Sequence, residues 1–277
     1  MIVVTGATGN VGRTLVRALA EQGHGVTAVS RGIAPSDVPH GVRTVTADLA
    51  QPAVGLPSAA DAVFLLVGGD LMMAGDPAQV VAPFADAGRI VLLSSQGVAT
   101  RPDSMSHGRA FAAFEQAVME SGTEWTILRP GGFASNSYAW APSIKAARTA
   151  AAPFGEVGLP VIDPDDIAAV AAITLTRPGH AKAIYELTGP APTTPRQRAA
   201  AIGDAIGAPV TFIDQTREEA RAQMLTFMPT PVADTTLDIL GTPTVREQTV
   251  SPDAEKILGR APGTFADWAR RNAEAFR

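Results

Sequence analysis

The stretch Met1-Ile2-Val3-Val4-Thr5-Gly6-Ala7-Thr8-Gly9-Asn10-Val11-Gly12 decides the fold of this chain. Its apolar run at residues 2–4 is typical of a short buried strand, and apolar residues recur with helical spacing over 13–20. Between them stand three glycines, each three residues from the next. Glycines allow a tight turn and a close approach to a pyrophosphate, to which a helix N-terminus offers free N–H groups. The pattern therefore predicts a dinucleotide site in preference to a ligand-free turn, although its spacing is GxxGxxG and not GxGxxG.

Composition limits the classes of partner and compartment. The chain has 277 residues, a formal net charge of −5 and no cysteine. This acidic balance gives no electrostatic basis for binding a nucleic acid or an anionic membrane. Without cysteine there is no disulfide, thiolate nucleophile or cysteine-based metal site. The longest apolar run, residues 62–67, is too short to span a bilayer, and the chain enters its first strand without a secretion signal, so we expect a cytoplasmic protein.

Strand and helix signals alternate along the first half of the chain. Short apolar runs typical of strands recur, with helical stretches between them, at residues 2–5, 26–29, 43–47, 61–67, 89–95 and 123–129. This alternation predicts an α/β fold with a doubly wound parallel sheet, a Rossmann domain that binds NAD(P) over residues 1–150. Residues 151–277 are expected to complete the sheet and to form a smaller α+β C-terminal lobe that binds substrate. Within this plan we expect helices at 107–120 and 196–206 and further strands at 183–189 and 209–213.

The residues after the second and third strands bear on the choice of nucleotide. Folds that prefer NAD place an acidic residue about twenty residues past the glycine turn, where it binds the ribose hydroxyls. This chain has Ser30 and Arg31 there, and an arginine can bind a 2′-phosphate with two hydrogen bonds. The pattern favours NADPH over NADH, against the alternative of an ordinary solvated arginine. Asp48, at the end of the third strand, could contact the adenine or cap the next segment.

Three carboxylates stand close together at Asp163, Asp165 and Asp166. A metal site is one interpretation of such a group. Asp163 followed by Pro164 is also typical of a helix N-cap with proline at the first helical position, and acidic residues are favourable in a first turn. We prefer the capping interpretation and expect no metal.

Several motifs together resemble the NmrA-like family of atypical short-chain dehydrogenases/reductases. The resemblance runs nearly from end to end and is carried by residues 3–12, the Ser30-Arg31 pair, Leu128-Arg129-Pro130-Gly131-Gly132-Phe133 with Asn136, Asp163-Pro164-Asp165-Asp166-Ile167-Ala168 and Thr264-Phe265-Ala266-Asp267-Trp268. The family includes NADPH-dependent quinone and triphenylmethane-dye reductases, and also redox sensors that bind NAD(P) without turnover.

The resemblance implies a set of contacts. The pyrophosphate would be held by the backbone of Gly6, Ala7, Thr8, Gly9, Asn10 and Val11. Arg31 would hold the 2′-phosphate, and Asp48 would face the adenine. The ribose and nicotinamide would be bordered by Val67, Gly68, Ser94, Pro130, Gly131 and Phe133. The substrate side would carry Asn136, Tyr138 and Trp140.

The chain departs from the short-chain dehydrogenase pattern at the proton relay. That pattern has a serine at the tip of strand five, then a tyrosine and, four residues later, a lysine. Here Ser95 is present, but His107 is nearest to the tyrosine position and Phe111 follows in place of lysine. His107 and Ser95 are therefore the catalytic candidates, with His107 as a general acid or, alternatively, as a helix-start contact.

Without the lysine, acceptors that spread negative charge are favoured over simple ketones. We expect an NADPH-dependent oxidoreductase that transfers hydride to a small aromatic, quinone-like or conjugated acceptor. A non-catalytic NADP(H)-sensing regulator and a Rossmann-fold cyclase or isomerase without net redox turnover remain alternatives. The expected partner is a small molecule, with the chain as a monomer or homodimer.

Overall fold

The computed structural model describes residues 1–51, 55–56, 59–69, 71–72 and 75–277. These residues form a seven-stranded sheet in the order β3-β2-β1-β4-β5-β6-β8, in which every neighbouring pair is parallel. The strands are β1 (Ile2–Thr5), β2 (Val26–Ser30), β3 (Arg43–Thr46), β4 (Ala62–Leu66), β5 (Arg89–Leu93), β6 (Glu124–Pro130) and β8 (Ala183–Leu187). The predicted doubly wound parallel sheet is confirmed, and its order reverses next to β1, where such folds bind nucleotides.

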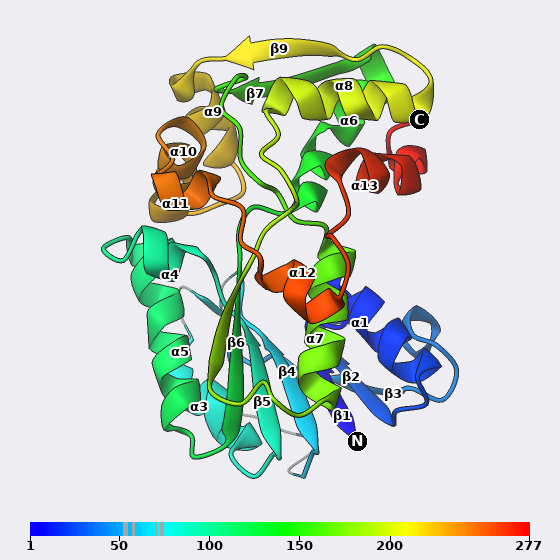
Figure 1. The fold of residues 1–277 in the computed structure, drawn as a ribbon, viewed down its shortest axis with the longest axis vertical. Helices are drawn as coiled ribbons and strands as arrows, with labels where there is room; N and C mark the ends of the chain where they lie inside the picture. The colour runs from blue at the N-terminus through cyan, green and yellow to red at the C-terminus, as the bar shows by residue number, and fades with distance from the viewer. Residues whose placement is uncertain (52–54, 57–58, 70, 73–74) are drawn as a thin grey trace.

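Helices cover both faces of this sheet because its strands are apolar on both sides (Figure 1). One face packs on α1 (Asn10–Glu21), α7 (Pro164–Thr176) and α12 (Asp253–Leu258), with Ile2 and Val4 of β1 in that core. Val3 points to the other core, which is covered by α3 (Pro77–Val81), η2 (Ala82–Phe84) and α5 (Phe111–Glu120). A short 3₁₀ turn, η1 (Pro35–Asp37), lies between β2 and β3.

The helix expected over 107–120 is present and begins two residues earlier, at Met105, with a first turn that is π-helical. α5 starts at Phe111 and is preceded by α4 (Gly97–Thr100) and by a π-helical turn, η3 (Met105–Ala110). η3 packs closely on the chain that leaves the sheet, since a Cβ on Gly108 would lie 2.0 Å from the carbonyl oxygen of Arg101. π-turns of this kind are frequent at functional sites.

A smaller lobe stands at the far end of the molecule from the large sheet (Figure 1). It contains β7 (Thr149–Pro153) paired in parallel with β9 (Thr211–Gln215), so the predicted strand at 209–213 is shifted by two residues. Its own core includes Ile144, Ile202 and Trp268. The helices around it are η4 (Ala134–Trp140), α6 (Ala141–Ala147), α8 (Pro195–Ile206), α13 (Phe265–Arg271) and η5 (Ala273–Ala275).

The chain passes repeatedly between the large sheet and the small lobe. It leaves the sheet after β6, returns for α7 and β8, and leaves again for α8. Residue 150, where the sequence predicted a boundary, lies inside β7. Three further helices join the lobes, namely α9 (Arg217–Met224), α10 (Thr230–Gly241) and α11 (Val245–Gln248). None of the helices in the described part of the chain has the length and apolar character that a bilayer crossing requires.

Candidate functional site

The glycine turn between β1 and α1 has the geometry that its sequence predicts. Gly6 has a positive φ of 61°, a backbone conformation that residues with a Cβ rarely adopt. Its carbonyl oxygen accepts from the Gly9 N–H at 3.0 Å. A Cβ on Gly12 would lie only 2.2 Å from the same oxygen, so this position tolerates no side chain without movement. No side chain among the described residues caps the start of α1. Its first N–H groups are therefore available to an anion.

Hydrogen bonds fix the end of β2 against this turn. The Ala7 N–H donates to the Val29 carbonyl at 3.1 Å, and the hydroxyls of Thr8 and Ser30 lie 2.9 Å apart. Arg31 follows directly and is exposed. The structure thus places the predicted 2′-phosphate residue beside the predicted pyrophosphate turn.

Asp48 occupies the exposed end of the third strand segment, past β3. Its carboxylate accepts from the Ala50 N–H at 3.1 Å, which closes a local turn. This contact corresponds to the capping alternative for Asp48. The carboxylate remains solvent-exposed on the ligand-facing edge of the sheet, so a contact with adenine stays a prediction.

The carboxyl ends of β4, β5, β6 and β8 meet at one edge of the sheet. Val67 is buried there, with the partly exposed Gly68 after it. The Gln96 N–H donates to the Pro130 carbonyl at 2.9 Å, and the Gly131 N–H donates to the Leu187 carbonyl at 3.0 Å. Figure 1 shows these strand ends pointing toward the small lobe. In parallel sheets this is the edge at which ligands bind.

Gln96 is a residue of this edge that the sequence analysis missed. Its side chain is only 6% exposed, and its Oε1 would lie 3.2 Å from a Cβ on Gly131, next to the predicted nicotinamide residues. Its Nε2 donates to the carbonyl of Arg246 at 3.3 Å. A signal was available, because Gln96 directly follows the two serines at the tip of the fifth strand.

Ser94 takes part in a buried ion-pair network. Its hydroxyl donates to Oε1 of Glu115 on α5 at 2.5 Å. Arg129 on β6 binds both oxygens of the same carboxylate, with its Nε 2.8 Å from Oε1 and an Nη 2.5 Å from Oε2. The Glu115 side chain is 4% exposed and that of Arg129 is 15% exposed. The network ties the ends of β5 and β6 to α5, and with them the backbone that would border the nicotinamide ribose.

Ser95 and His107 both lie against Gly97. The Ser95 hydroxyl oxygen accepts from the Gly97 N–H at 3.0 Å. A Cβ on Gly97 would lie 2.7 Å from the Cβ of His107, so glycine is required for η3 to reach the tip of β5. The structure therefore brings the two catalytic candidates to the same corner of the sheet. Phe111, at the usual lysine position, packs in the core beneath them.

The protonation state of His107 follows from its neighbours. Burial lowers its pKa from the usual value, and the charge of Glu247 only partly opposes this effect. Nδ1 lies 2.8 Å from the Ser106 hydroxyl, and that hydroxyl donates to the Pro231 carbonyl at 3.2 Å. Because the hydroxyl has a single proton, it can donate either to the Pro231 carbonyl or to Nδ1, and the tautomer of His107 changes with that choice. The lowered pKa leaves the His107 ring neutral at neutral pH.

The three predicted substrate residues lie on different sides of η4. Asn136 is exposed. The Tyr138 hydroxyl donates to Oδ1 of Asn272 at 2.5 Å, and the Tyr138 ring centroid is 5.1 Å from that of Trp268. The Trp140 indole donates to the Ala151 carbonyl at 2.9 Å, inside the small lobe. The structure brings Tyr138 close to the glycine turn but does not bring the three side chains together.

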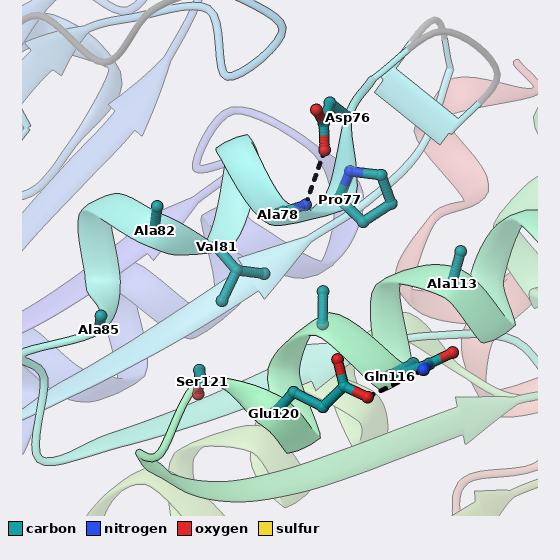
Figure 2. A pocket seen from close by; sticks show the side chains of 11 residues that line it. Asp76, Pro77, Ala78, Val81, Ala82, Ala85, Ala113, Gln116, Glu120 and Ser121 are labelled. Carbon is teal, nitrogen blue, oxygen red and sulfur yellow. Dashed lines mark hydrogen bonds between the residues drawn. The ribbon is translucent and has the colours of Figure 1, made fainter.

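Tyr138 lines a pocket of about 180 Å³ beside the start of α1. Gly9, Asn10 and Arg13 form one wall of this pocket, and Asp163 contributes to another. A polar pocket at this helix N-terminus is consistent with the predicted pyrophosphate contacts. A larger pocket of about 440 Å³ lies on the opposite face, between α3 and α5. Figure 2 shows that it is lined by alanines and by the side chains of Gln116 and Glu120. None of the candidate residues lines it.

The predicted helix cap at Asp163 is confirmed. Its carboxylate accepts from the Asp165 N–H at 3.0 Å at the start of α7, and it also pairs with Arg271. Burial raises the pKa of Asp163. Asp165 accepts from the Thr14 hydroxyl at 2.8 Å, which joins α7 to α1. Over the described ranges, no three His, Cys, Asp or Glu side chains are grouped so as to hold a metal ion.

Comparisons with known proteins show the family of this chain. Residues 6–178 match the model of a family described as NAD(P)H-binding. The chain belongs to the NAD(P)H-binding family. The match begins directly after β1 and covers the glycine turn, strands β2 to β6 of the large sheet and α7.

Two full-length relatives of this NAD(P)H-binding protein are named as reductases. Each is 34% identical and aligns over 100% of this chain and 99% of its own length. One is the (4-alkanoyl-5-oxo-2,5-dihydrofuran-3-yl)methyl phosphate reductase of Streptomyces griseus. The other is the NAD(P)H azoreductase of Xenophilus azovorans. This protein is accordingly an oxidoreductase.

Solved structures share the fold over nearly the whole chain. The triphenylmethane reductase of Citrobacter sp., in complex with NADP(H), has a TM-score of 0.77 at 20% identity and covers 99% of this chain and 100% of its own. The NADPH-dependent quinone oxidoreductase of Escherichia coli, in complex with NADPH, has a TM-score of 0.76 at 22% identity, with 98% and 99% covered. The two-lobed architecture of Figure 1 is thus one seen in experimentally determined structures.

Proposed function

We propose that this protein transfers hydride from NADPH to a small aromatic, quinone-like or conjugated acceptor. The observation that carries the proposal is the meeting of the glycine turn and the carboxyl ends of β4, β5 and β6 at one edge, with no lysine at position 111. Two full-length relatives named as reductases, one of them an azoreductase, support the same reaction class. The nicotinamide supplies the hydride when bound, and the chain supplies binding and orientation.

The protonation of His107 favours acceptors of this kind. Hydride addition to a simple ketone leaves a localised alkoxide, which needs a proton donor at once. Burial lowers the pKa of His107, so the ring is neutral at neutral pH and a weak proton donor. A quinone, azo or enone acceptor spreads the negative charge after hydride addition and can take its proton from water. His107 and Ser95 then act at the acceptor as polar contacts, and His107 becomes a strong proton donor only at lower pH, when the ring is protonated.

Preference for NADPH is the finer part of this proposal. Arg31 lies exposed just after the Thr8–Ser30 contact, and no acidic residue stands at the end of β2. A guanidinium there binds the 2′-phosphate and has no counterpart on the ribose of NADH. We therefore place the 2′-phosphate of NADPH at Arg31, and the pyrophosphate at the start of α1.

The test is oxidation of NADPH and NADH, followed by absorbance, with a panel of quinones, azo dyes and enones. Turnover with NADPH preferred is the expected result. Arg31→Ala is expected to weaken NADPH binding by about tenfold or more and to leave NADH binding unchanged, since a charge-assisted contact is lost for one nucleotide alone. Arg17→Ala, an exposed arginine on α1, is the matched control. Equal NADPH affinity in Arg31→Ala would refute the preference, and no turnover with any acceptor would refute the reaction.

A further inference from the structure

Arg101, which directly follows α4, is hydrogen-bonded to both α10 and α11. Its Nε and one Nη each lie 2.8 Å from an oxygen of the Glu247 carboxylate on α11. The same Nη donates to the Thr242 carbonyl at 2.8 Å and lies 3.4 Å from the carbonyl oxygen of Asp238, at the end of α10. A guanidinium is a rigid planar fork, so it holds these acceptors in one geometry. One side chain thus joins the segment 230–248, which contains both helices, to the chain that leaves β5.

The partner of Arg101 is a buried carboxylate. The Glu247 side chain is 3% exposed, against 20% for Arg101. Burial raises the pKa of Glu247, but hydrogen bonds from Arg101, from the Thr244 N–H and from Thr100 outweigh this effect and lower the pKa below its usual value. Glu247 is therefore ionised, with Arg101 as its counter-charge. The desolvation cost of a buried pair can cancel its electrostatic gain, so what this pair supplies is a fixed placement of α11.

The start of α10 contacts the corner of the sheet where His107 lies. The Ser106 hydroxyl oxygen is 2.8 Å from Nδ1 of His107 and 3.2 Å from the carbonyl oxygen of Pro231, in the first turn of α10. On the same part of η3, the hydroxyls of Ser104 and Thr235 are 3.0 Å apart. α10 thus packs on η3 through the residue that hydrogen-bonds to His107.

α11 reaches the same edge of the sheet through Gln96. The Gln96 Nε2 donates to the Arg246 carbonyl at 3.3 Å, and its Oε1 would lie 3.2 Å from a Cβ on Gly131, which is predicted to border the nicotinamide. Figure 1 shows α10 and α11 between α4 and the small lobe. The segment 230–248 is therefore connected to this edge at two places, one beside His107 and one beside Gly131.

The last turn of α10 is also fixed from the small lobe. Phe154 follows β7 and has a positive φ of 56°, which a residue with a Cβ keeps only where its surroundings impose it. A Cβ on Gly241 would lie 2.5 Å from Cζ of the Phe154 ring, so the ring lies directly against the end of α10. Arg101 holds the same turn, together with α11, from the side of the large sheet.

We propose that Arg101 is a positioning residue for the hydride acceptor: by binding Glu247 and the end of α10, it holds the segment 230–248 as the acceptor-side wall of the reaction site. This inference rests on the proposed reductase function. An acceptor must approach both the nicotinamide and His107, and the segment contacts the neighbours of both, at Gln96 and Ser106. A wall contributes to binding in proportion to the area that it covers on the acceptor, so its displacement weakens binding.

The cofactor phosphates should keep their contacts when this wall moves. The glycine turn follows β1, and β4 separates β1 from β5 in the sheet. Arg101 therefore acts on the acceptor without acting on the part of NADPH that is bound at α1. This separation is what the experiment measures.

Binding and turnover are measured separately. Affinity for a naphthoquinone is measured by calorimetry on the NADP⁺-loaded protein, in which no hydride can be transferred, and NADPH affinity is measured by fluorescence titration. Arg101→Gln is expected to weaken naphthoquinone binding and to raise its KM by about tenfold, with kcat changed by less than about threefold and NADPH affinity unchanged. KM and kcat separate in this way because a wall binds the acceptor alike before and during hydride transfer.

Arg221→Gln is the matched control. It removes the same charge from an ion pair with Asp234 that joins α9 to α10, in which both side chains are 42% exposed. Exposed pairs contribute little, so naphthoquinone binding should be retained. Arg101→Lys should fall between the parent and Arg101→Gln, because an ammonium keeps the charge but cannot form the planar fork.

A second variant keeps the test decisive if Arg101→Gln, which leaves Glu247 unpaired, fails to fold. Arg101→Gln/Glu247→Gln removes both charges and is expected to bind the naphthoquinone as weakly. Its hydrogen exchange without ligand should be faster over 230–248 and unchanged over α1.

Unchanged naphthoquinone affinity in the variants that fold would overturn the proposal, and so would an equal loss of NADPH affinity. A fall in kcat with naphthoquinone affinity retained would overturn it too. A parent protein that turns over no acceptor would instead refute the reductase function and with it the acceptor wall, whereas hydrogen exchange, which needs no acceptor, would still show whether Arg101 holds the segment.

Discussion

Removal of either member of the Glu115–Arg129 pair should unfold the protein at a markedly lower temperature. Both partners are largely buried, at 4% and 15% side-chain exposure, and they form two hydrogen bonds. Breaking such a pair by removing one partner costs about 3–5 kcal/mol, because an uncompensated buried charge remains. For a chain of this size each kcal/mol lowers the melting temperature by about 2–4 °C, so Arg129→Met is expected to lower it by roughly 6–20 °C.

The double variant Glu115→Met/Arg129→Met distinguishes the effect of an unpaired buried charge from the effect of altered packing. If the cost lies in the unpaired charge, the double variant should be more stable than the sum of the single variants by about 2 kcal/mol or more. Circular dichroism and intrinsic fluorescence, followed during thermal and urea unfolding, provide the measurement. Strictly additive single effects would refute the reasoning. Ser94 donates to the same carboxylate at 2.5 Å, so NADPH affinity of the single variants is expected to fall as well.

Two further predictions concern the glycine turn and His107. Gly12→Ala would place its Cβ 2.2 Å from the Gly6 carbonyl oxygen, so it should lower the free energy of unfolding by about 1–3 kcal/mol and abolish NADPH binding. In the control Gly25→Ala the new Cβ meets no atom within 4 Å, so neither stability nor NADPH binding should change. Unaltered NADPH titration of Gly12→Ala would contradict the close packing. Because burial lowers the His107 pKa below 6.5, the folded state takes up this proton less readily than the unfolded chain. The stability contributed by neutral His107 is complete above pH 6.5 and is lost as the pH falls through the lowered pKa. Relative to His107→Asn, the melting temperature of the intact protein should therefore decline in that window, and parallel pH profiles would contradict this expectation.

The parts of the fold that were predicted from sequence are those set by local chemistry. The strand, glycine turn and helix of residues 1–20 follow from a short apolar run and from glycine spacing, and both are visible in one window. The helix cap at Asp163 can be predicted from the Asp163-Pro164 pair alone, because proline is favoured at the first position of a helix. The parallel sheet follows from the alternation of such windows.

The features that were not predicted depend on contacts between distant residues. At η3 the chain approaches its neighbours closely at Gly97 and Gly108, and nothing in the local sequence distinguishes these glycines from those of ordinary turns. Glu115 has the polarity of an exposed helix residue, and its burial follows from Arg129 on another element. Arg198 likewise gives no local sign that its helix turns it inward. Side-chain placement of this kind is decided by tertiary packing rather than by periodicity.

The return of the chain to the large sheet for α7 and β8 has a consequence for how the protein is made. β6 has its outer edge unpaired until β8 joins it, and the apolar face next to α1 stays open until α7 packs there. A ribosome must therefore release residues up to Leu187, the end of β8, before the nucleotide-binding half can close. Fragments cut at residue 150 would retain every glycine of the turn and yet expose an unfinished sheet. We therefore expect the two lobes to fold as one unit. Chimaeras with another reductase should fold when whole chains or single loops are exchanged.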